Sequence, residues 1–465
     1  MNSSILMTDP ERAWAPFEPG AGDPWDLARV AHLHRRAGFA APWAVLQRDL
    51  KDGPTASINR LLEGEPDAGD GTPAREFATL LDGMAARLGP SGGPARLQGI
   101  WLYRMIFTPH PLRERMTLFW HDHFATSITK VNNPALLQRQ NAMLRAQALG
   151  SFRDLLGAMG TDPAMLAWLD ATVNRKTHPN ENYAREVMEL FTLGRGHYTE
   201  TDVQEAARAY TGRFVVGEQY REVPAQHDDG PKTVLGRTGP LRGEDVDRIL
   251  LEQPACAEFL CGKLFGLFVS EVDPPPAGLI APLAAALRAS GYDIRVPVAR
   301  ILRSRLFFDR AARWRRVKAP VEFAVGTIRA LEVLRPTAPA EALAEACARM
   351  GQGLYAPPSV AGWDGGPAWI NTATLLARSN FALALLSATD GTFGKRLDPR
   401  ALAGRHAGTS PEDVARFFID LLVQDALDAE VRGRVVATAG RAADPAAAAR
   451  EAAALVLTSP EYQRA

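Results

Sequence analysis

Cysteine is scarce in this chain: its 465 residues include three, Cys256, Cys261 and Cys347. A small, odd number of cysteines cannot form the paired framework of a disulfide-stabilised secreted domain, and their spacing matches no zinc ribbon. We therefore expect buried thiols in a protein of a reducing compartment.

Net charge and long apolar runs are also missing. The 53 Lys and Arg residues balance the 53 Asp and Glu residues, which gives no reason to expect nucleic acid or an anionic membrane as a partner. No run approaches the roughly 20 apolar residues of a transmembrane helix, the longest being near 279–287. The N-terminus has neither the basic nor the apolar region of a secretion signal, so a cytoplasmic location is the default expectation.

Three common catalytic motifs do not occur, and a fourth occurs only in a loop-like stretch. The sequence contains no H-E-x-x-H, G-x-x-x-x-G-K-[ST] or G-x-G-x-x-G, which argues against a zincin, a P-loop protein and a Rossmann protein. Its one G-x-S-x-G match, residues 89–93, lies in a Gly/Pro-rich stretch typical of a surface loop and not of the strand-to-helix turn of a serine hydrolase. A local run of basic residues at 300–318 is better explained as a solvated face paired with carboxylates than as an anion site, because charge is balanced elsewhere.

Helical periodicity dominates what is present. In SPEDVARFFIDLLV, Ser410 is placed to cap a helix, Pro411 suits its first turn, and apolar residues recur on one face. Only residues 213–238 break this period, with β-branched and aromatic residues on both sides of a Pro/Asp/Gly turn. The sequence predicts a mainly α fold: a large irregular helical bundle, one unit over residues 20–465, with a small β-hairpin excursion and an N-terminal arm at 1–19.

Histidines mark the chemical centre, since six of the nine lie within residues 110–240. His121 and His123 flank Asp122, and neutral imidazoles are good ligands for a divalent metal ion. On a regular helix, positions i and i+2 are separated by roughly 200° and cannot face one ion. Unless the helix ends there, at most one of the two can point at a given site, and the alternative is that one ring packs in the core while the other is solvated.

A second cluster lies in NENYAREVMELFTLG, where Asn182, Glu186 and Glu189 share one helical face. A carboxylate pair at i, i+3 can form half of a metal or acid–base site. The alternative is an exposed helix laced by i, i+4 ion pairs, since Arg185 has a glutamate four residues away on each side.

The next segments add further candidates. Thr199 and Asp202 have the spacing of a capping box, so we assign them no catalytic role. Glu205 follows on the same helix, and His227 with Lys232 falls in the expected hairpin turn. Two aromatic residues, Trp363 and Trp369, lie on a Gly/Pro-rich loop where they can stack on a ligand or pin the loop to the core.

Several blocks together resemble the bacterial domain-of-unknown-function family 1800: HLHRRAGF, FWHDHF, DPAMLAWLD, NENYAREVMELFTLGRGHYTETDVQEAARAYTG, HDDGPKTVLG, VKAPVEFAVGTIRAL, YAPPSVAGW and SPEYQ. The resemblance spans nearly the whole chain and implies a predominantly helical unit, but it brings no agreed reaction. Asp122 stands where similar members often have Asn, and Arg213 stands where an aromatic residue is usual. Relatives are often exported, which implies a task at the cell envelope.

Two functions follow as expectations. The first is a metal-assisted enzyme, with a hydrolase as the leading reaction type: His121, His123 and His227 would bind a divalent metal ion, and Glu186, Glu205 and Glu189 would supply the catalytic carboxylates. The second is a non-catalytic binding or assembly protein of the cell envelope whose polar centre is a structural hydrogen-bonded network. For either function the expected partner is a small molecule, a glycan or a protein, bound through Asn182, Arg185, Lys232, Trp363 and Trp369.

Overall fold

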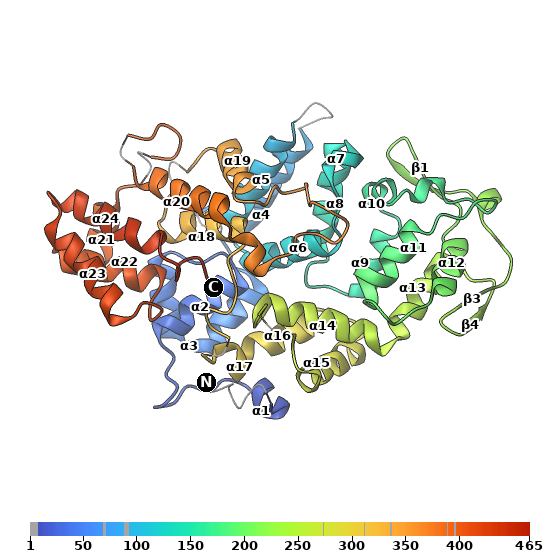
Figure 1. Cartoon of the computed structure of the whole chain (residues 1–465), viewed down its shortest axis with the longest axis horizontal. Coiled ribbons are helices and arrows are strands. Elements are labelled where there is room, and N and C mark those ends of the chain that lie inside the picture. Colours follow the sequence, from blue (N-terminus) through green and yellow to red (C-terminus); the bar gives the residue numbers. More distant parts are fainter. Residues whose placement is uncertain are drawn as a thin grey trace.

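The computed structural model describes residues 8–67, 71–87, 93–272, 274–310, 312–334, 337–387, 389–394 and 397–465. Helices dominate it, which confirms the predicted mainly α fold (Figure 1). None of the described helices is both long and apolar enough to cross a membrane. Residues 1–7 of the predicted N-terminal arm lie outside the described residues, and the predicted single unit from residue 20 stays a prediction.

Helices follow one another with short connections through most of the chain. The first are α1 (Pro10–Trp14), α2 (Leu27–Ala37), α3 (Trp43–Glu63), α4 (Ala74–Ala86), α5 (Pro94–Phe107), α6 (Pro111–His123), α7 (Ile128–Val131) and α8 (Pro134–Ala146). The middle ones are α9 (Phe152–Met159), α10 (Pro163–Trp168), α11 (Asn182–Glu186), α12 (Glu200–Ala209), α13 (Gly243–Glu252), α14 (Pro254–Phe268), α15 (Ala277–Ala289), α16 (Arg295–Arg303) and α17 (Arg305–Phe308). The last are α18 (Pro320–Ala330), α19 (Ala340–Arg349), α20 (Thr372–Leu386), α21 (Pro399–His406), α22 (Pro411–Leu422), α23 (Ala429–Arg441) and α24 (Pro445–Leu457).

Helix α22 forms for the reasons that its sequence predicts. The Ser410 side chain accepts the backbone N–H of Asp413, and Pro411 occupies the first turn. The face that carries Phe417 and Phe418 is buried. An apolar stripe of this kind is stable only when it packs against other helices, and α22 packs against α23 and α24.

Two large hydrophobic cores in the described part of the chain share helices, and a small third cluster holds Phe77 and Leu81 of α4. The first core gathers buried residues from α1, α9 and α12–α17, and the second gathers those from α5, α18–α20 and α21–α24. Helix α2 gives Leu33 to the first core and Val30 to the second, and α6 likewise gives Trp120 to the first and Leu118 to the second. Because α2 and α6 face apolar residues on two sides, their polar residues are held in the interior, where each needs a partner.

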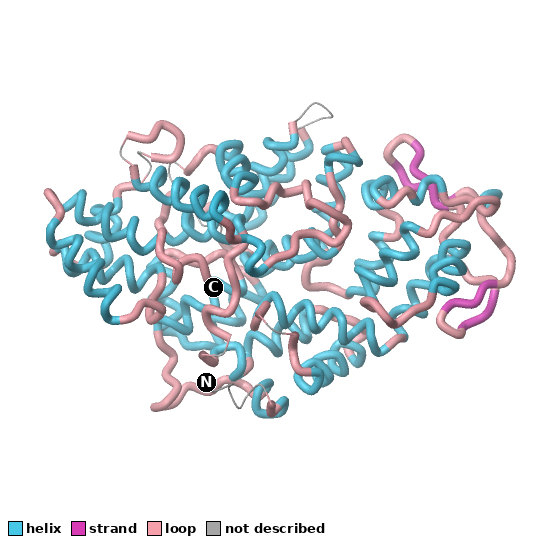
Figure 2. The backbone as a smooth tube through the Cα atoms, viewed as in Figure 1, coloured by secondary structure: helices cyan, strands magenta, loops and turns pink. Residues whose placement is uncertain are grey.

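The β structure of the described residues lies where the sequence predicts it and comprises two hairpins (Figure 2). Strand β1 (Arg213–Val216) pairs antiparallel with β2 (Gln219–Glu222), and β3 (Lys232–Val234) pairs antiparallel with β4 (Arg237–Gly239). Both hairpins lie at the end of the molecule opposite α21–α24 (Figure 1). Four short helical turns complete the described structure: η2 (Ala171–Val173), the π-helix η3 (Val187–Thr192), η4 (Pro224–Gln226) and η5 (Gly366–Trp369).

Candidate functional site

The two histidines of the HDH sequence point to different partners. Both lie in the last turn of α6, which ends at His123. Nε2 of His121 accepts the backbone N–H of Tyr355 at 3.0 Å. His123 is placed between Phe191 and Lys263: its Nε2 lies 3.1 Å from the carbonyl of Phe191, and its Nδ1 lies 3.2 Å from Nζ of Lys263.

These contacts fix the charge and tautomer of His123. A carbonyl can only accept, so Nε2 carries the proton and Nδ1 is left to accept from the lysine. Burial, reinforced by the charge of Lys263, holds the pKa of His123 well below its usual value, and burial alone lowers the pKa of His121 to about 3. Both rings are therefore neutral at pH 7, and both nitrogens of His123 are already engaged.

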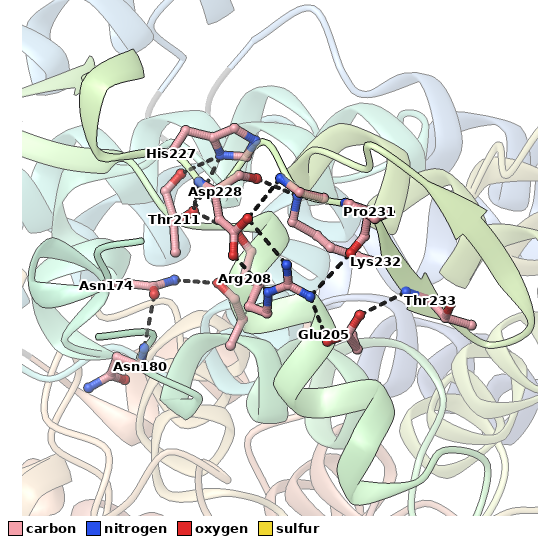
Figure 3. Close-up of polar contacts among 12 residues, drawn as sticks. Asn174, Asn180, Glu205, Arg208, Thr211, His227, Asp228, Pro231, Lys232 and Thr233 are labelled. Atoms are coloured by element: carbon pink, nitrogen blue, oxygen red, sulfur yellow. Dashed lines mark hydrogen bonds and ion pairs between the residues drawn. The ribbon is translucent and has the colours of Figure 1, made fainter. Parts of the chain in front are cut away.

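His227 is engaged elsewhere, in the loop before β3 (Figure 3). Its Nδ1 lies 3.0 Å from the carbonyl oxygen of Thr211, and the ring is buried. The hydroxyl of Thr211 accepts the backbone N–H of Asp228 at 2.9 Å. This histidine thus helps to hold the loop against the end of α12.

Arg208 is the centre of the same network, which we call the α12 staple: Glu205, Arg208, Thr211, His227, Asp228 and Lys232. The Arg208 guanidinium donates to Asp228 at 2.7 Å, to Glu205 at 2.8 Å and to the carbonyl of Pro231 at 3.2 Å (Figure 3). The second oxygen of Glu205 accepts the backbone N–H of Thr233 at 2.9 Å. Glu205 is therefore held between an arginine and a strand, as a structural carboxylate.

Lys232 has a structural position as well. Its ammonium group donates to the carbonyl oxygens of Asp228 and Gly230, and the residue is buried. Burial lowers its pKa, with the charge of Asp228 opposing that shift. Two of its three N–H donors therefore close its own turn.

The second predicted cluster spans a change of helix type. Helix α11 ends at Glu186 and continues as the π-helix η3. Glu189 pairs with Arg195 at 2.7 Å and accepts from the Tyr198 hydroxyl at 2.6 Å, while Arg185 pairs with Glu181 and Glu200. The expected pair between Arg185 and Glu189 is therefore absent among the described contacts.

Glu186 and Asn182 remain on the outer side of this region. Glu186 has no hydrogen-bond or ion-pair partner in the described part of the chain, and burial with the nearby charge of Glu189 raises its pKa. Asn182 makes one long hydrogen bond, 3.4 Å from Nδ2 to Asp170. Sequence patterns did not predict the π-helix, a feature that is frequent at functional sites; here its Phe191 carbonyl contacts His123.

The loop that carries the two tryptophans crosses the end of α6. The backbone N–H of Trp363 donates to Oδ1 of Asp122 at 2.9 Å, and its half-buried ring lies 5.8 Å from the ring of His121. Gly362 has φ +83°, and a Cβ there would lie 2.3 Å from the same Asp122 oxygen, so the close approach requires glycine. Trp369 is buried in η5, as expected for a residue that pins the loop.

Three further charged residues act on Asp122 through their charges, and with it they form the central charged site: Asp122, Lys263, Glu271 and Arg316. Burial raises the pKa of Asp122 to about 6, although the Trp363 N–H and the charge of Lys263 oppose the shift. Burial lowers the pKa of Lys263, against the attraction of Asp122. Arg316 pairs with Oε1 of Glu271, whereas Oε2 of Glu271 is buried without a partner in the described residues.

The predicted metal ligands are not gathered in one place. No group of three or more His, Cys, Asp or Glu residues in the described ranges is arranged to hold a metal ion. His121, His123 and His227 each bond to the backbone of a different segment. The three cysteines are free and buried, as expected. The metal site therefore stays a prediction that these contacts do not support.

Fold and site together define a helical protein with two cores and a charged site where their shared helix α6 ends. The chain belongs to the family described as protein of unknown function (DUF1800), whose model matches residues 32–464. That match confirms the resemblance carried by the sequence blocks. No curated protein and no solved structure matches the chain.

Proposed function

We propose that the protein is a binding protein whose polar centre is structural and whose ligand is a hydroxyl-rich molecule of the glycan class. The observation that carries the structural role is the α12 staple, in which Arg208, Glu205 and Lys232 bond to groups of the same chain. Groups committed in this way cannot bind a ligand without first breaking internal contacts.

The central charged site supports the binding role, because some of its polar atoms have no partner in the described residues. Oε2 of Glu271 has no partner in the described residues, and Asp122 uses one oxygen for Trp363. Carboxylate oxygens accept hydrogen bonds from hydroxyl groups, and a tryptophan ring offers an apolar face to a sugar ring. Asp122, Glu271 and Trp363 thus combine the two kinds of contact that a glycan needs.

The metal-assisted enzyme stays a prediction with its own requirement. It needs at least one open histidine nitrogen next to an uncommitted carboxylate. Glu186 is uncommitted, but both nitrogens of His123 are engaged and Glu205 is bonded to Arg208 and Thr233.

A comparison of His123→Ala with His197→Ala separates the two functions. His197 is exposed and serves as the control. We expect His123→Ala to lower the free energy of unfolding by about 2–4 kcal/mol, since it removes a buried ring and leaves the Phe191 carbonyl unpaired. The control should change it by less than about 0.5 kcal/mol. Stoichiometric metal in purified wild type that disappears in a stably folded His123→Ala variant would support the enzyme instead.

The ligand is tested with neutral glucose hexasaccharides in a thermophoresis titration. We expect saturable binding by wild type, a loss of at least tenfold in affinity for Trp363→Ala or Glu271→Gln, and unchanged affinity for Glu189→Gln, which lies outside the site. Equal affinity in all variants, or no binding by wild type to any member of a wider panel of neutral oligosaccharides, would refute the glycan proposal.

A further inference from the structure

A separate cavity of about 400 Å³ opens beside α3. Small-molecule sites are commonly about 300–1,000 Å³. Its apolar wall includes Val45, Leu61 and Ile106, and its polar wall includes His34, Asp49 and Arg329. The residues of the central charged site do not line it, so whatever it binds goes beyond the function proposed above.

His34 and Asp49 form a buried pair at this wall. Nε2 of His34 lies 2.8 Å from Oδ2 of Asp49, and both side chains are almost fully buried. Oδ1 of Asp49 accepts from Arg48 at 2.9 Å and from Arg60 at 2.6 Å. Burial favours the neutral acid, yet the bonds from His34 and Arg48 outweigh it and hold the pKa of Asp49 below its usual value.

The pair also fixes the tautomer of His34. A carboxylate can only accept, so Nε2 carries the proton in the neutral ring. Nδ1 is then an acceptor, and it has no hydrogen-bond partner among the residues that the structure describes. Nδ1 is thus an unpaired polar atom of His34, and His34 lines the cavity.

Arg329 supplies the charge that a ligand can meet. Its Nε and Nη1 donate to the backbone carbonyls of Ala40, Met105 and Ile106. No carboxylate pairs with it in the described part of the chain, and no hydrogen bond occupies its Nη2. Burial lowers the pKa of Arg329 to about 10, so it is still a cation at pH 7.

The other charges that line the cavity are largely paired with one another. Arg48 pairs with Asp49 and with Glu65 at 2.7 Å, and Arg60 pairs with Asp49 and Asp52. Asp67 is exposed at the edge of the lining. Arg329 is thus the arginine of this lining whose guanidinium has no carboxylate partner among the described residues.

We propose that this cavity binds a small aliphatic carboxylate, with its carboxylate on Arg329 and its chain against Val45, Leu61 and Ile106. A half-buried guanidinium without a counter-ion is poorly compensated, so an anion that fits the cavity gains both the charge pairing and the burial of its apolar chain. An uncharged molecule of the same shape gains only the burial of its apolar chain.

The test compares hexanoate with hexanamide on wild type at pH 7. We expect hexanoate to raise the midpoint temperature saturably, by about 1–3 °C at a tenfold excess over its Kd, and to shift the imidazole NMR signals of His34. Hexanamide should bind at least tenfold more weakly. Equal binding of acid and amide would overturn the proposal.

Two variants test whether hexanoate binds at Arg329 in this cavity. Arg329→Gln should abolish the preference for the acid, whereas Arg349→Gln, an exposed arginine paired with Glu345, should preserve it. If Arg329→Gln does not fold, Val45→Phe tests the same site by filling the cavity, and it should abolish binding of hexanoate. Undiminished binding by a folded Arg329→Gln or Val45→Phe variant would place the ligand elsewhere and refute the site.

Discussion

Asp122 couples its protonation to folding. Its usual pKa of 3.8 rises to about 6 in the folded chain, mainly through burial. The folded state therefore binds the proton more tightly than the unfolded state does. The contribution of protonated Asp122 to the free energy of unfolding is fully present below about pH 4 and is lost as the pH rises through about 6.

Asp122→Asn should remove this pH dependence while keeping a carbonyl oxygen for the N–H of Trp363. We expect the free energy of unfolding of wild type to fall more between pH 4 and pH 7 than that of the variant, by about 1–3 kcal/mol. Urea unfolding at four pH values measures the difference. Parallel curves for the two proteins would show that Asp122 does not titrate in this way.

Residue patterns pointed to the end of α6 but did not predict the four residues of the central charged site. The i, i+2 spacing of His121 and His123 correctly indicated that one helix cannot aim both rings at one ion. Lys263 could not be found in that way, because it lies 140 residues from His123 and no local motif marks it. Glu271 and Arg316 come from still other segments, and only the packing of the two cores brings them to Asp122.

Among the elements, helix ends were predicted better than helix interiors. The capping box of Thr199 and Asp202 forms as its spacing predicts, since it depends on four consecutive residues. The ion pair expected between Arg185 and Glu189 fails, since the π-helix beginning at Val187 changes the rotation per residue. Nothing in a local charge pattern specifies that change.

The α12 staple gives a prediction for one element. Arg208→Ala should lower the free energy of unfolding by about 1–2 kcal/mol, a modest value because the guanidinium is partly exposed. It should also speed limited proteolysis within residues 225–239, because the loop before β3 loses its anchor on α12.

The control for that prediction is Arg248→Ala. Arg248 is well exposed and forms only local ion pairs with Asp245 and Glu252 on α13. Its loss should cost less than about 0.5 kcal/mol and leave the cleavage rate unchanged. Equal effects of the two variants on proteolysis would contradict the anchoring role.

At the scale of the whole molecule, charged residues on the shared helices join the two cores. Arg36 on α2 and Arg115 on α6 are fully buried, and Arg115 pairs with Glu322 on α18. Arg316 reaches Glu322 at 3.3 Å and also pairs with Glu271. The blocks HLHRRAGF and VKAPVEF, which are far apart in the chain, thus supply residues to one buried network.

Glu322 is the most connected carboxylate of that network. Burial would raise its pKa, yet the charges of Arg115 and Arg316 outweigh burial and lower it. The carboxylate compensates guanidinium charges that have no access to water, and Nε of both Arg36 and Arg115 is buried without a partner in the described residues. Removal of one member of such a group leaves buried charge uncompensated, which typically costs about 3–5 kcal/mol.

Glu322→Gln should therefore destabilise the chain strongly although it preserves side-chain volume. We expect a loss of about 3–5 kcal/mol in urea unfolding at pH 7, compared with less than about 0.5 kcal/mol for Glu412→Gln, whose exposed carboxylate pairs with Arg416 on α22. Because Glu322 joins α18 of the second core to Arg115 on the shared helix α6, fluorescence and circular dichroism should report the same shifted midpoint. A variant within 1 kcal/mol of wild type would mean that the arginines find another counter-charge or deprotonate, and that apolar packing alone holds the two cores together.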